Sequence, residues 1–437
     1  MIDSLQNIFR IPDLRKKILF TLGMFIVYRL GGHIPVPGIN TAALAAFFDS
    51  VRGSVLGLYD IFAGGNLRRA TIFALGIMPY ISASIILQLL SAVIPYYQQL
   101  QKEGEEGRRK INQHTRYLTI LIAGIQSLGI AIFLERVTGP GSVPIVAHPG
   151  IGFRLLTMIT LTTGTIFVMW LGEMITEHGI GNGISLLIMI GILSRYPGAA
   201  VSMWRMLSKG AMSWFTFGFL LVVVFVITAA VVVVTQAQRR IPVQYAKRVV
   251  GRRIYGGQTT HLPLNVNAAG VIPIIFAQSV IMFPASIAQF FSRFEFFQTI
   301  SDMFSTTSPV YVIVYAGLIV FFAYFYTAIV INPQDLAENM KKYGGFIPGI
   351  RPGAKTAEYI DKVMTRITLP GALFFAFIAI LPMYLIHKFR VPFYFGGTSL
   401  IITVGVILDT AQQIEAQLLM RHYDGFLKSG RIRGRRR

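Results

Sequence analysis

The sequence of 437 residues contains no cysteine. A disulfide, a thiolate metal site and a cysteine nucleophile are therefore excluded. Charged residues are also few, at 14% of the chain, whereas a soluble protein carries roughly 25%. Acidic residues are the scarcer kind: 19 Asp and Glu stand against 40 Lys and Arg, for a formal net charge of +21. The motifs GxxxxGK(S/T), HExxH and GxSxG are absent, so we expect no P-loop, zinc-protease or serine-hydrolase chemistry.

Hydrophobic residues, by contrast, make up 54% of the chain, and its mean hydropathy is +0.60. This composition indicates a polytopic membrane protein. A membrane-spanning helix needs about 20 apolar residues. Ten runs predict an all-α fold with ten spans, at residues 14–35, 70–94, 117–135, 154–172, 184–204, 211–235, 266–290, 309–331, 367–386 and 398–420. The first run follows a basic cluster as in a signal peptide, but no cleavage site follows it, so we expect a first membrane helix.

Basic residues are distributed unevenly between the connections. The termini and the even-numbered connections hold 28 Lys and Arg, and the odd-numbered ones hold 11. By the positive-inside rule, both termini are then cytoplasmic. Ten spans divide into an N-terminal half, residues 1–205, and a C-terminal half, residues 206–420, followed by a basic tail, residues 421–437. Because each half has five spans, the halves would be inverted relative to each other, with the working site at their interface.

The stretch from Gly57 to Leu90 pairs a short apolar piece with a longer one. Residues 57–62 are too few to cross a bilayer, whereas residues 70–90 are long enough but are interrupted by Gly76 and Pro79. Broken backbone at membrane depth must be buried in protein or line a water-filled cavity, because lipid offers no hydrogen-bond partners. We therefore predict a half-helix folded into a pore or binding cavity. The alternative is a surface loop followed by an ordinary Pro-kinked helix.

Two predicted cytoplasmic connections are long and polar, at residues 239–265 and 332–366. The first is rich in Arg and Lys, and the second has a turn-rich tip of Gly and Pro at residues 344–353. The alternation of side chains in residues 243–255 predicts a β-hairpin. Anionic lipids would bind the basic residues without a hairpin, so we favour docking of a large acidic partner over lipid contact alone.

Ionisable residues inside the predicted spans are few: Arg29, Asp409, Glu415 and, at an edge, Glu173. An ion-coupled transporter needs a carboxylate or charge pair on its substrate path. Asp409 and Glu415 lie near the cytoplasmic half of the last span, so we expect structural or interfacial roles for them. An inverted-repeat secondary transporter of a small solute stays the alternative function. An intramembrane enzyme is disfavoured by the missing nucleophile and metal ligands, and we expect no cofactor.

Several long motifs resemble the SecY family, the large subunits of bacterial protein-conducting channels. The resemblance runs almost end to end and rests on motifs such as FAGGNLRRATIFALGIMPYISASIILQLL, WLGEMITEHGIGNGISLLI, QRRIPVQYAKR, FIPGIRPGAKTAEYIDKVMTR and VPFYFGGTSLIITVGVILD. It implies a ten-helix pore in the plasma membrane that conducts unfolded, signal-bearing polypeptides and releases membrane helices sideways into lipid. Such a channel is not an enzyme.

The same resemblance assigns three groups of residues to the pore. A plug from Leu58 to Arg68 would close it, with the residues Leu58, Ile61, Phe62, Gly64, Gly65, Asn66 and Arg68. A mid-membrane ring would be formed by Ile77, Ile81, Ile184, Ile188, Ile275 and Ile402. A lateral gate would carry the polar residues Ser82, Gln126 and Asn267. The residue type supports such a ring independently of the resemblance. Branched aliphatic side chains cannot hydrate ions, and a narrow apolar constriction dewets.

The resemblance also implies the partners. The two long connections match the docking site for the ribosome and for the SecA motor ATPase, through Arg239, Arg240, Lys247, Arg248, Arg252, Arg253 and Arg351. The basic cluster suits ribosomal RNA, since phosphate contacts dominate such binding and need no sequence readout. The small subunits SecE and SecG, secretory preproteins with their signal sequences, and anionic lipids are the remaining expected partners.

Overall fold

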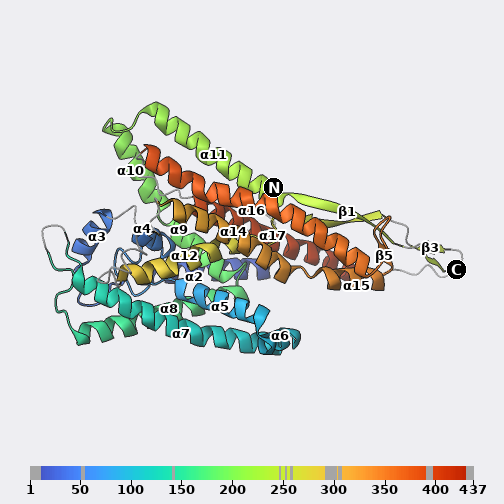
Figure 1. Ribbon diagram of the computed structural model, residues 1–437, viewed down its shortest axis with the longest axis horizontal. Helices are drawn as coiled ribbons and strands as arrows, with labels where there is room; N and C mark the ends of the chain where they lie inside the picture. The colour runs from blue at the N-terminus through green and yellow to red at the C-terminus, as the bar shows by residue number, and fades with distance from the viewer. Residues whose placement is uncertain are drawn as a thin grey trace. The chain divides into compact units, whose positions relative to one another are not determined.

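The computed structural model describes a predominantly helical chain (Figure 1). The described residues are 11–50, 55–139, 143–245, 248–250, 253–255, 259–290, 303, 308–389 and 397–429. The chain divides into two compact units. Unit 1 consists of residues 1–198, 282–302 and 406–437, and unit 2 consists of residues 199–281 and 303–405.

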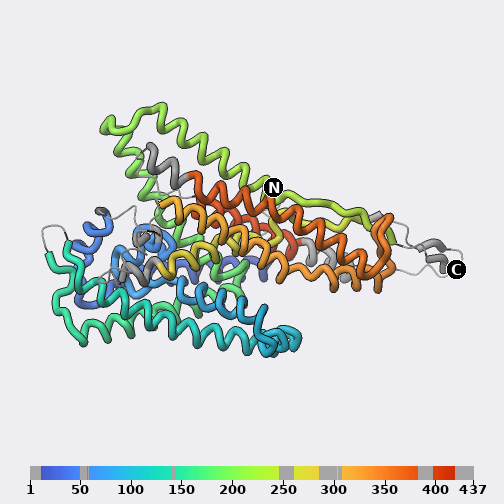
Figure 2. Tube along the Cα trace, in the orientation of Figure 1, coloured from blue at the N-terminus to red at the C-terminus, as the bar shows by residue number. Residues whose placement is uncertain are grey.

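Unit 1 contains the helices of the first predicted spans. They are α2 (Pro12–Gly31), α3 (Thr41–Ser50), α4 (Val55–Phe62), α5 (Met78–Val93), α6 (Pro95–Lys102), α7 (Glu105–Arg136), α8 (Ile151–His178) and α9 (Gly183–Leu193). Helix α7 packs against α5 and α8, while α8 also packs against α2 and α9. The tube in Figure 2 follows α5 into α6 through a sharp bend, which measures 96°.

Unit 2 contains α11 (Trp214–Gln236), α14 (Pro309–Val330), α15 (Pro333–Lys342) and α16 (Ala354–Phe389). Three further helices run from one unit into the other: α10 (Tyr196–Ser208), α12 (Ile272–Phe290) and α17 (Gly397–Ser429). Helix α16 packs against α14, α15 and α11.

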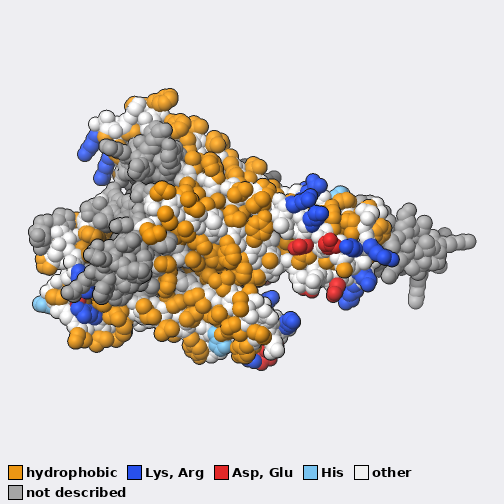
Figure 3. Space-filling view, viewed as in Figure 1, with side chains coloured by type: hydrophobic (Ala, Val, Ile, Leu, Met, Phe, Trp, Pro, Cys, Tyr) orange, Lys and Arg blue, Asp and Glu red, His pale blue; other side chains and the backbone are white. Residues whose placement is uncertain are grey.

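Each of the ten predicted spans overlaps a helix or a helix pair. Among the described residues, seven helical segments are long and apolar enough to cross a membrane, and an eighth is added if α5 and α6 form one broken span. Large apolar side chains stay exposed on these helices, with Phe215 at 83%, Phe225 at 74% and Ile313 at 71%. Figure 3 shows such side chains spread over the helices. Contiguous apolar surface of this kind is solvated by lipid, so the all-α polytopic membrane fold is confirmed.

A small sheet forms in unit 2, as the side-chain alternation predicts. The strands are β1 (Gln238–Tyr245), β2 (Arg248–Val250), β3 (Arg253–Tyr255), β4 (Thr259–Asn265) and β5 (Gly345–Phe346). Strand β1 lies between β4 and β5, and both pairings are antiparallel. Strands β2 and β3 pair separately, with Val249 opposite Ile254. The predicted hairpin is therefore confirmed, and it is built as two successive antiparallel pairs.

The predicted start of the second span is wrong. Residues 63–77 form a succession of turns, and helix α5 begins only at Met78. Pro79 lies in the first turn of α5, where its missing N–H costs nothing, so it begins this helix and does not interrupt it. With 16 residues, α5 is about 24 Å long, shorter than the roughly 30 Å of a hydrocarbon core. The run is apolar because it is buried in protein.

The turn segment is accommodated by neighbouring glycines. Gly164 of α8 faces the carbonyl oxygen of Ile72, and Gly31 of α2 faces the ring of Phe73, each so closely that a Cβ atom would clash. In both places the absence of a side chain lets the turns approach a helix directly.

We predict that Gly164→Ala destabilises the protein, because the added methyl group meets backbone that cannot move aside. Overpacking of this kind costs about 1–3 kcal/mol. Gly124→Ala in α7 is the matched control, since a Cβ atom there meets nothing within 4 Å. Thermal unfolding of the purified protein in detergent checks this: a lower Tm for Gly164→Ala alone is expected, and equal Tm values for both variants would contradict it.

Candidate functional site

Most of the predicted plug, residues 58–68, is buried within unit 1; the side chain of Leu58 lies outside the described part of the structure. The predicted plug comprises the end of α4 and the first turns after it, and α4 packs against α9. Ile61 and Phe62 are only 6% and 4% exposed. Gly64 and Gly65 have φ values of 72° and 81°, a left-handed conformation that suits glycine. This segment is therefore not a surface loop.

A carboxylate that the sequence analysis overlooked lies inside this segment. Asp60 is 2% exposed, and its Oδ1 accepts a hydrogen bond from the backbone N–H of Arg68 at 2.9 Å. Burial raises the pKa of the Asp60 carboxyl above its ordinary value, while the positive charge of Arg195 acts to lower it. A lone acidic residue in an apolar stretch was the available signal.

Two further contacts fix the plug's borders. The guanidinium of Arg68 forms an ion pair with Asp49 at 2.7 Å. Asn66, which is 2% exposed, donates from Nδ2 to the hydroxyl of Tyr28 at 3.4 Å. Tyr28 in turn stacks on Phe73, with ring centroids 5.8 Å apart. The predicted plug is thus attached both to α2 and to the end of α3.

The backbone of residues 63–77 is paired by hydrogen bonds within the protein. The N–H of Val36 donates to the carbonyl of Ala70 at 2.8 Å, and the N–H of Ile72 donates to the carbonyl of Ile34 at 3.0 Å. The N–H of Thr71 donates to the carbonyl of Asn66 at 3.0 Å. These bonds satisfy groups that lipid could not.

The six predicted ring residues are divided between the two units. Unit 1 contains Ile77 and Ile81 at the start of α5, and Ile184 and Ile188 at the start of α9. Unit 2 contains Ile275 on α12 and Ile402 on α17, which are 5% and 0% exposed. Of the four in unit 1, Ile184 is half-buried and the others are buried. The ring itself stays a prediction.

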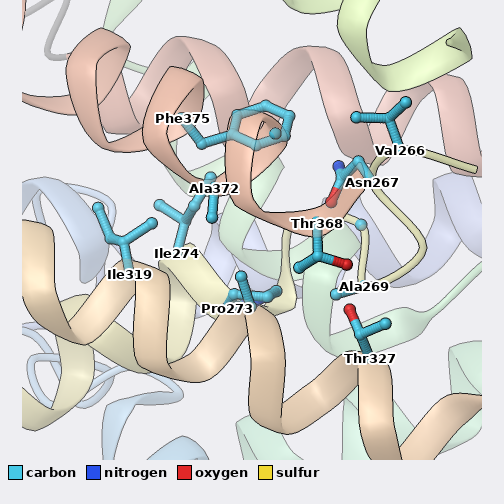
Figure 4. A pocket seen from close by; sticks show the side chains of 13 residues that line it. Val266, Asn267, Ala269, Pro273, Ile274, Ile319, Thr327, Thr368, Ala372 and Phe375 are labelled. Atoms are coloured by element: carbon cyan, nitrogen blue, oxygen red, sulfur yellow. The ribbon is translucent and has the colours of Figure 1, made fainter. Parts of the chain in front are cut away.

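The three predicted gate residues are likewise divided between the units. Ser82 and Gln126 lie on α5 and α7, which pack together in unit 1. Asn267 lies in unit 2 and lines a small pocket, with room for about one water molecule, together with Thr327 and Thr368 (Figure 4). Within the described part of the chain, the amide oxygen of Gln126 and the amide nitrogen of Asn267 are buried without a hydrogen-bond partner. Both gate positions therefore carry unsatisfied polar groups.

The predicted docking region of unit 2 is built on an apolar core. Strands β1 and β4 and helices α15 and α16 contribute to it through the buried residues Ile241, Val243, Leu264, Met340, Ile347, Ile360 and Met364. Because side chains alternate along β1, Arg240, Pro242 and Gln244 face outward between the buried Ile241 and Val243. Figure 3 shows Lys and Arg gathered around this end of unit 2.

The basic residues predicted to bind partners are described to different extents. Arg239, Arg240 and Arg351 are exposed. Arg351 precedes α16, and its carbonyl accepts a hydrogen bond from the hydroxyl of Thr356 at 3.0 Å. Arg248 and Arg253 lie on the paired strands β2 and β3. Lys247 and Arg252 lie outside the described residues.

The ionisable residues of the predicted spans differ in their surroundings. Glu173 forms a double hydrogen bond with Arg116, at 2.8 Å for each, and so joins α8 to α7. Asp409 is half-buried on α17. Among the residues that the structure describes, no cluster of three His, Asp or Glu could hold a metal ion.

Comparison with known proteins decides the family. The SecY family model matches residues 71–411. The chain is 49% identical to the protein translocase subunit SecY of Escherichia coli strain K12, over 97% of this chain and 96% of that protein. It is 47% identical to the SecY subunit of Aquifex aeolicus strain VF5, over 98% of this chain and 100% of that protein. The chain belongs to the SecY family.

Solved structures agree with this SecY fold. A SecY protein whose plug domain is reported to stabilise the closed state of the translocation channel matches with a TM-score of 0.67 at 18% identity. That match covers 96% of this chain and 95% of the other. Canine Sec61, from a ribosome–channel complex of the endoplasmic reticulum, matches with a TM-score of 0.63 at 17% identity, over 96% of this chain and 95% of that one.

Helix α9, which bears two of the ring positions, begins with a side-chain cap. The Oδ1 of Asn182 accepts a hydrogen bond from the backbone N–H of Ser185 at 3.1 Å. We predict that Asn182→Ala lowers the free energy of unfolding by about 1 kcal/mol, whereas Asn182→Ser, which keeps a cap, costs much less. Thermal unfolding in detergent checks this, and equal losses for both variants would show that the cap does not stabilise α9.

Proposed function

We propose that this chain is the pore-forming subunit of a protein translocation channel. It passes unfolded, signal-bearing polypeptides across a membrane and releases membrane helices sideways into lipid. The observation that carries the proposal is the match to translocase subunits over nearly the whole chain, at close to half identity. The buried half-helix α4, which is followed by non-helical backbone, supports it, since such backbone at membrane depth belongs to a cavity or pore.

The proposed pore closes in two ways. The ring of Ile77, Ile81, Ile184, Ile188, Ile275 and Ile402 excludes ions by dewetting, because aliphatic side chains offer no ligands to replace an ion's water. The same side chains form no specific bonds to a passing polypeptide, so the ring accepts chains of any sequence. The plug, residues 58–68, blocks the path while no polypeptide is present.

The proposed lateral gate carries polar side chains at Ser82, Gln126 and Asn267. Hydrogen bonds between membrane helices contribute only about 0.6–2 kcal/mol each. An apolar signal helix gains roughly 0.8 kcal/mol for each CH₂ group that it transfers into lipid, and can therefore outweigh them. Among the described residues, the amide oxygen of Gln126 and the amide nitrogen of Asn267 form no hydrogen bond, which fits a site that exchanges its partners.

The energy for transport would come from partners that dock on the cytoplasmic side of a bacterial plasma membrane, where both termini would also lie. The exposed Arg239, Arg240 and Arg351 on a rigid apolar core suit an acidic surface such as ribosomal RNA or the SecA motor. A neighbour in fold, canine Sec61, is known from a ribosome complex. SecE and SecG would complete the channel, with anionic lipids around it.

Ion leakage tests the proposed ring. We predict that Ile188→Asn raises the ion flux of the resting channel in proteoliposomes by at least about tenfold, because an amide in the constriction holds water there. Ile190→Asn, on the same helix and outside the ring, is the matched control and is expected to leak far less. Equal ion tightness of Ile188→Asn and the parent would remove Ile188 from the ring.

Motor-driven transport tests the proposed docking surface. We predict that Arg351→Glu reduces ATP-dependent preprotein transport by SecA at least about tenfold, because it reverses an exposed charge at the contact. Resting ion flux should stay unchanged, since Arg351 lies outside the pore. Arg205→Glu on α10, also an exposed arginine, is the control. Full transport by Arg351→Glu would place the docking contact elsewhere.

A further inference from the structure

An ion pair joins the proposed plug to Arg195, which lies just after the end of helix α9 in unit 1. The Nη1 of Arg195 lies 3.2 Å from the Oδ2 of Asp60, although the two residues are far apart in the sequence. The Asp60 side chain is 2% exposed and that of Arg195 is 23% exposed. Asp60 belongs to α4 in the plug, whereas Arg195 follows the end of α9, outside the plug.

The two oxygens of the Asp60 carboxylate have different partners. Oδ1 accepts the N–H of Arg68, a bond that stays within the plug. Oδ2 faces Arg195, so the ionic contact reaches from the plug to its surroundings. A buried carboxylate needs a positive partner, because leaving it unpaired in a low-dielectric site is strongly unfavourable.

A direct backbone contact lies beside this ion pair. A Cβ atom on Gly64 would lie 3.0 Å from the Cα of Gly191, and one on Gly191 would lie 3.3 Å from the Cα of Gly64. Gly191 lies in the last turn of α9 and precedes Arg195 by four residues, so the two contacts are adjacent at the C-terminal end of α9. The glycines let the plug approach α9 without side chains between them, and this approach brings Asp60 within reach of Arg195.

We propose that Arg195 is a positioning residue for the plug: its ion pair with Asp60 holds α4 against α9 in the closed channel. This inference rests on the proposed function of residues 58–68 as the plug. The plug can leave its site only if the pair separates. Arg195 then remains partly hydrated where it is, while Asp60 leaves a buried site and gains water as the plug moves.

The ion pair predicts which variants should leak most ions. Arg195→Gln leaves the Asp60 carboxylate buried and unpaired, so the docked plug is strongly disfavoured. Asp60→Asn keeps an acceptor for the Arg68 N–H and removes only the negative charge that faces the partly exposed Arg195, a milder change. The double variant Asp60→Asn with Arg195→Gln has no buried charge, and the Gly64–Gly191 contact still docks the plug. The double variant should therefore leak fewer ions than Arg195→Gln alone.

The experiment uses the full chain with its SecE partner in proteoliposomes and has two readouts. One is the resting ion flux. The other is the reaction of a single introduced cysteine, Ile61→Cys, with a membrane-impermeant maleimide, which is clean because the chain has no other cysteine. Ile61 is 6% exposed in the docked plug, so the parent background should react slowly.

We expect Arg195→Gln to raise both the ion flux and the labelling rate at least about tenfold. In the double variant, both values should return most of the way to those of the parent. Arg195→Lys, which keeps the charge, should stay near the parent and serves if Arg195→Gln folds poorly. Arg154→Gln is the matched control: Arg154 also pairs with a buried carboxylate, that of Glu135 at 2.7 Å, outside the plug. It should change neither readout.

Two failures can be told apart by deleting residues 58–68. A leaky deletion variant, with Arg195→Gln as tight and as slowly labelled as the parent, would overturn the role of Arg195 and leave the plug in place. An ion-tight deletion variant would instead contradict the plug. A double variant leakier than Arg195→Gln would also overturn the inference, because the two residues would then act independently.

Discussion

Lipid offers no partner to a peptide N–H or carbonyl, and the structure of unit 1 depends on this constraint. Helices satisfy it internally, but residues 63–77 are not helical. Their backbone is paired instead by turns and by the segment after α2, through Val36 with Ala70 and Ile72 with Ile34. A non-helical segment can therefore exist at membrane depth only because other helices surround it, and these helices make the site for the plug.

Close packing around this segment follows from the same constraint. Gly31 and Gly164 remove side chains where the turns meet α2 and α8, and Gly64 meets Gly191 where the plug meets α9. Phe73 fills the remaining space, with its ring stacked between Tyr28 and Phe167 at centroid distances of 5.8 Å and 5.9 Å. A proposed plug that is held by backbone contact and one ion pair would be well placed without being permanently fixed, as a part that moves during transport requires.

Much of the fold could be predicted from the sequence, because long apolar runs and side-chain alternation are local signals. They placed each predicted span on or beside an apolar helix, of which seven or eight among the described residues are long enough to cross a membrane, and they located the hairpin within residues 243–255. The start of α5 at Met78 could not be found in this way, since an apolar run has the same composition whether it is a helix in lipid or a turn buried in protein. The pairing of Asp60 with Arg195 was also out of reach, because it depends on how distant segments pack.

The site could be predicted in part. Family resemblance supplied the ring, gate and docking residues, and the structure gives a physical setting to the plug and to the docking region. Each of these lies within one unit. The predicted plug packs against α9, and the predicted docking residues Arg239, Arg240 and Arg351 lie on segments that share an apolar core. The ring and gate draw residues from both units, so their assembly remains a prediction.

The most direct test of the account is transport of a preprotein into proteoliposomes that contain this chain with a SecE partner. SecA, ATP and a signal-bearing preprotein would be added, and protection of the preprotein from external protease would be measured. If the chain forms a protein-conducting channel, the preprotein should be protected only when both ATP and an intact signal sequence are present. Absence of protection, together with gradient-driven uptake of a small solute, would contradict it and favour a secondary transporter.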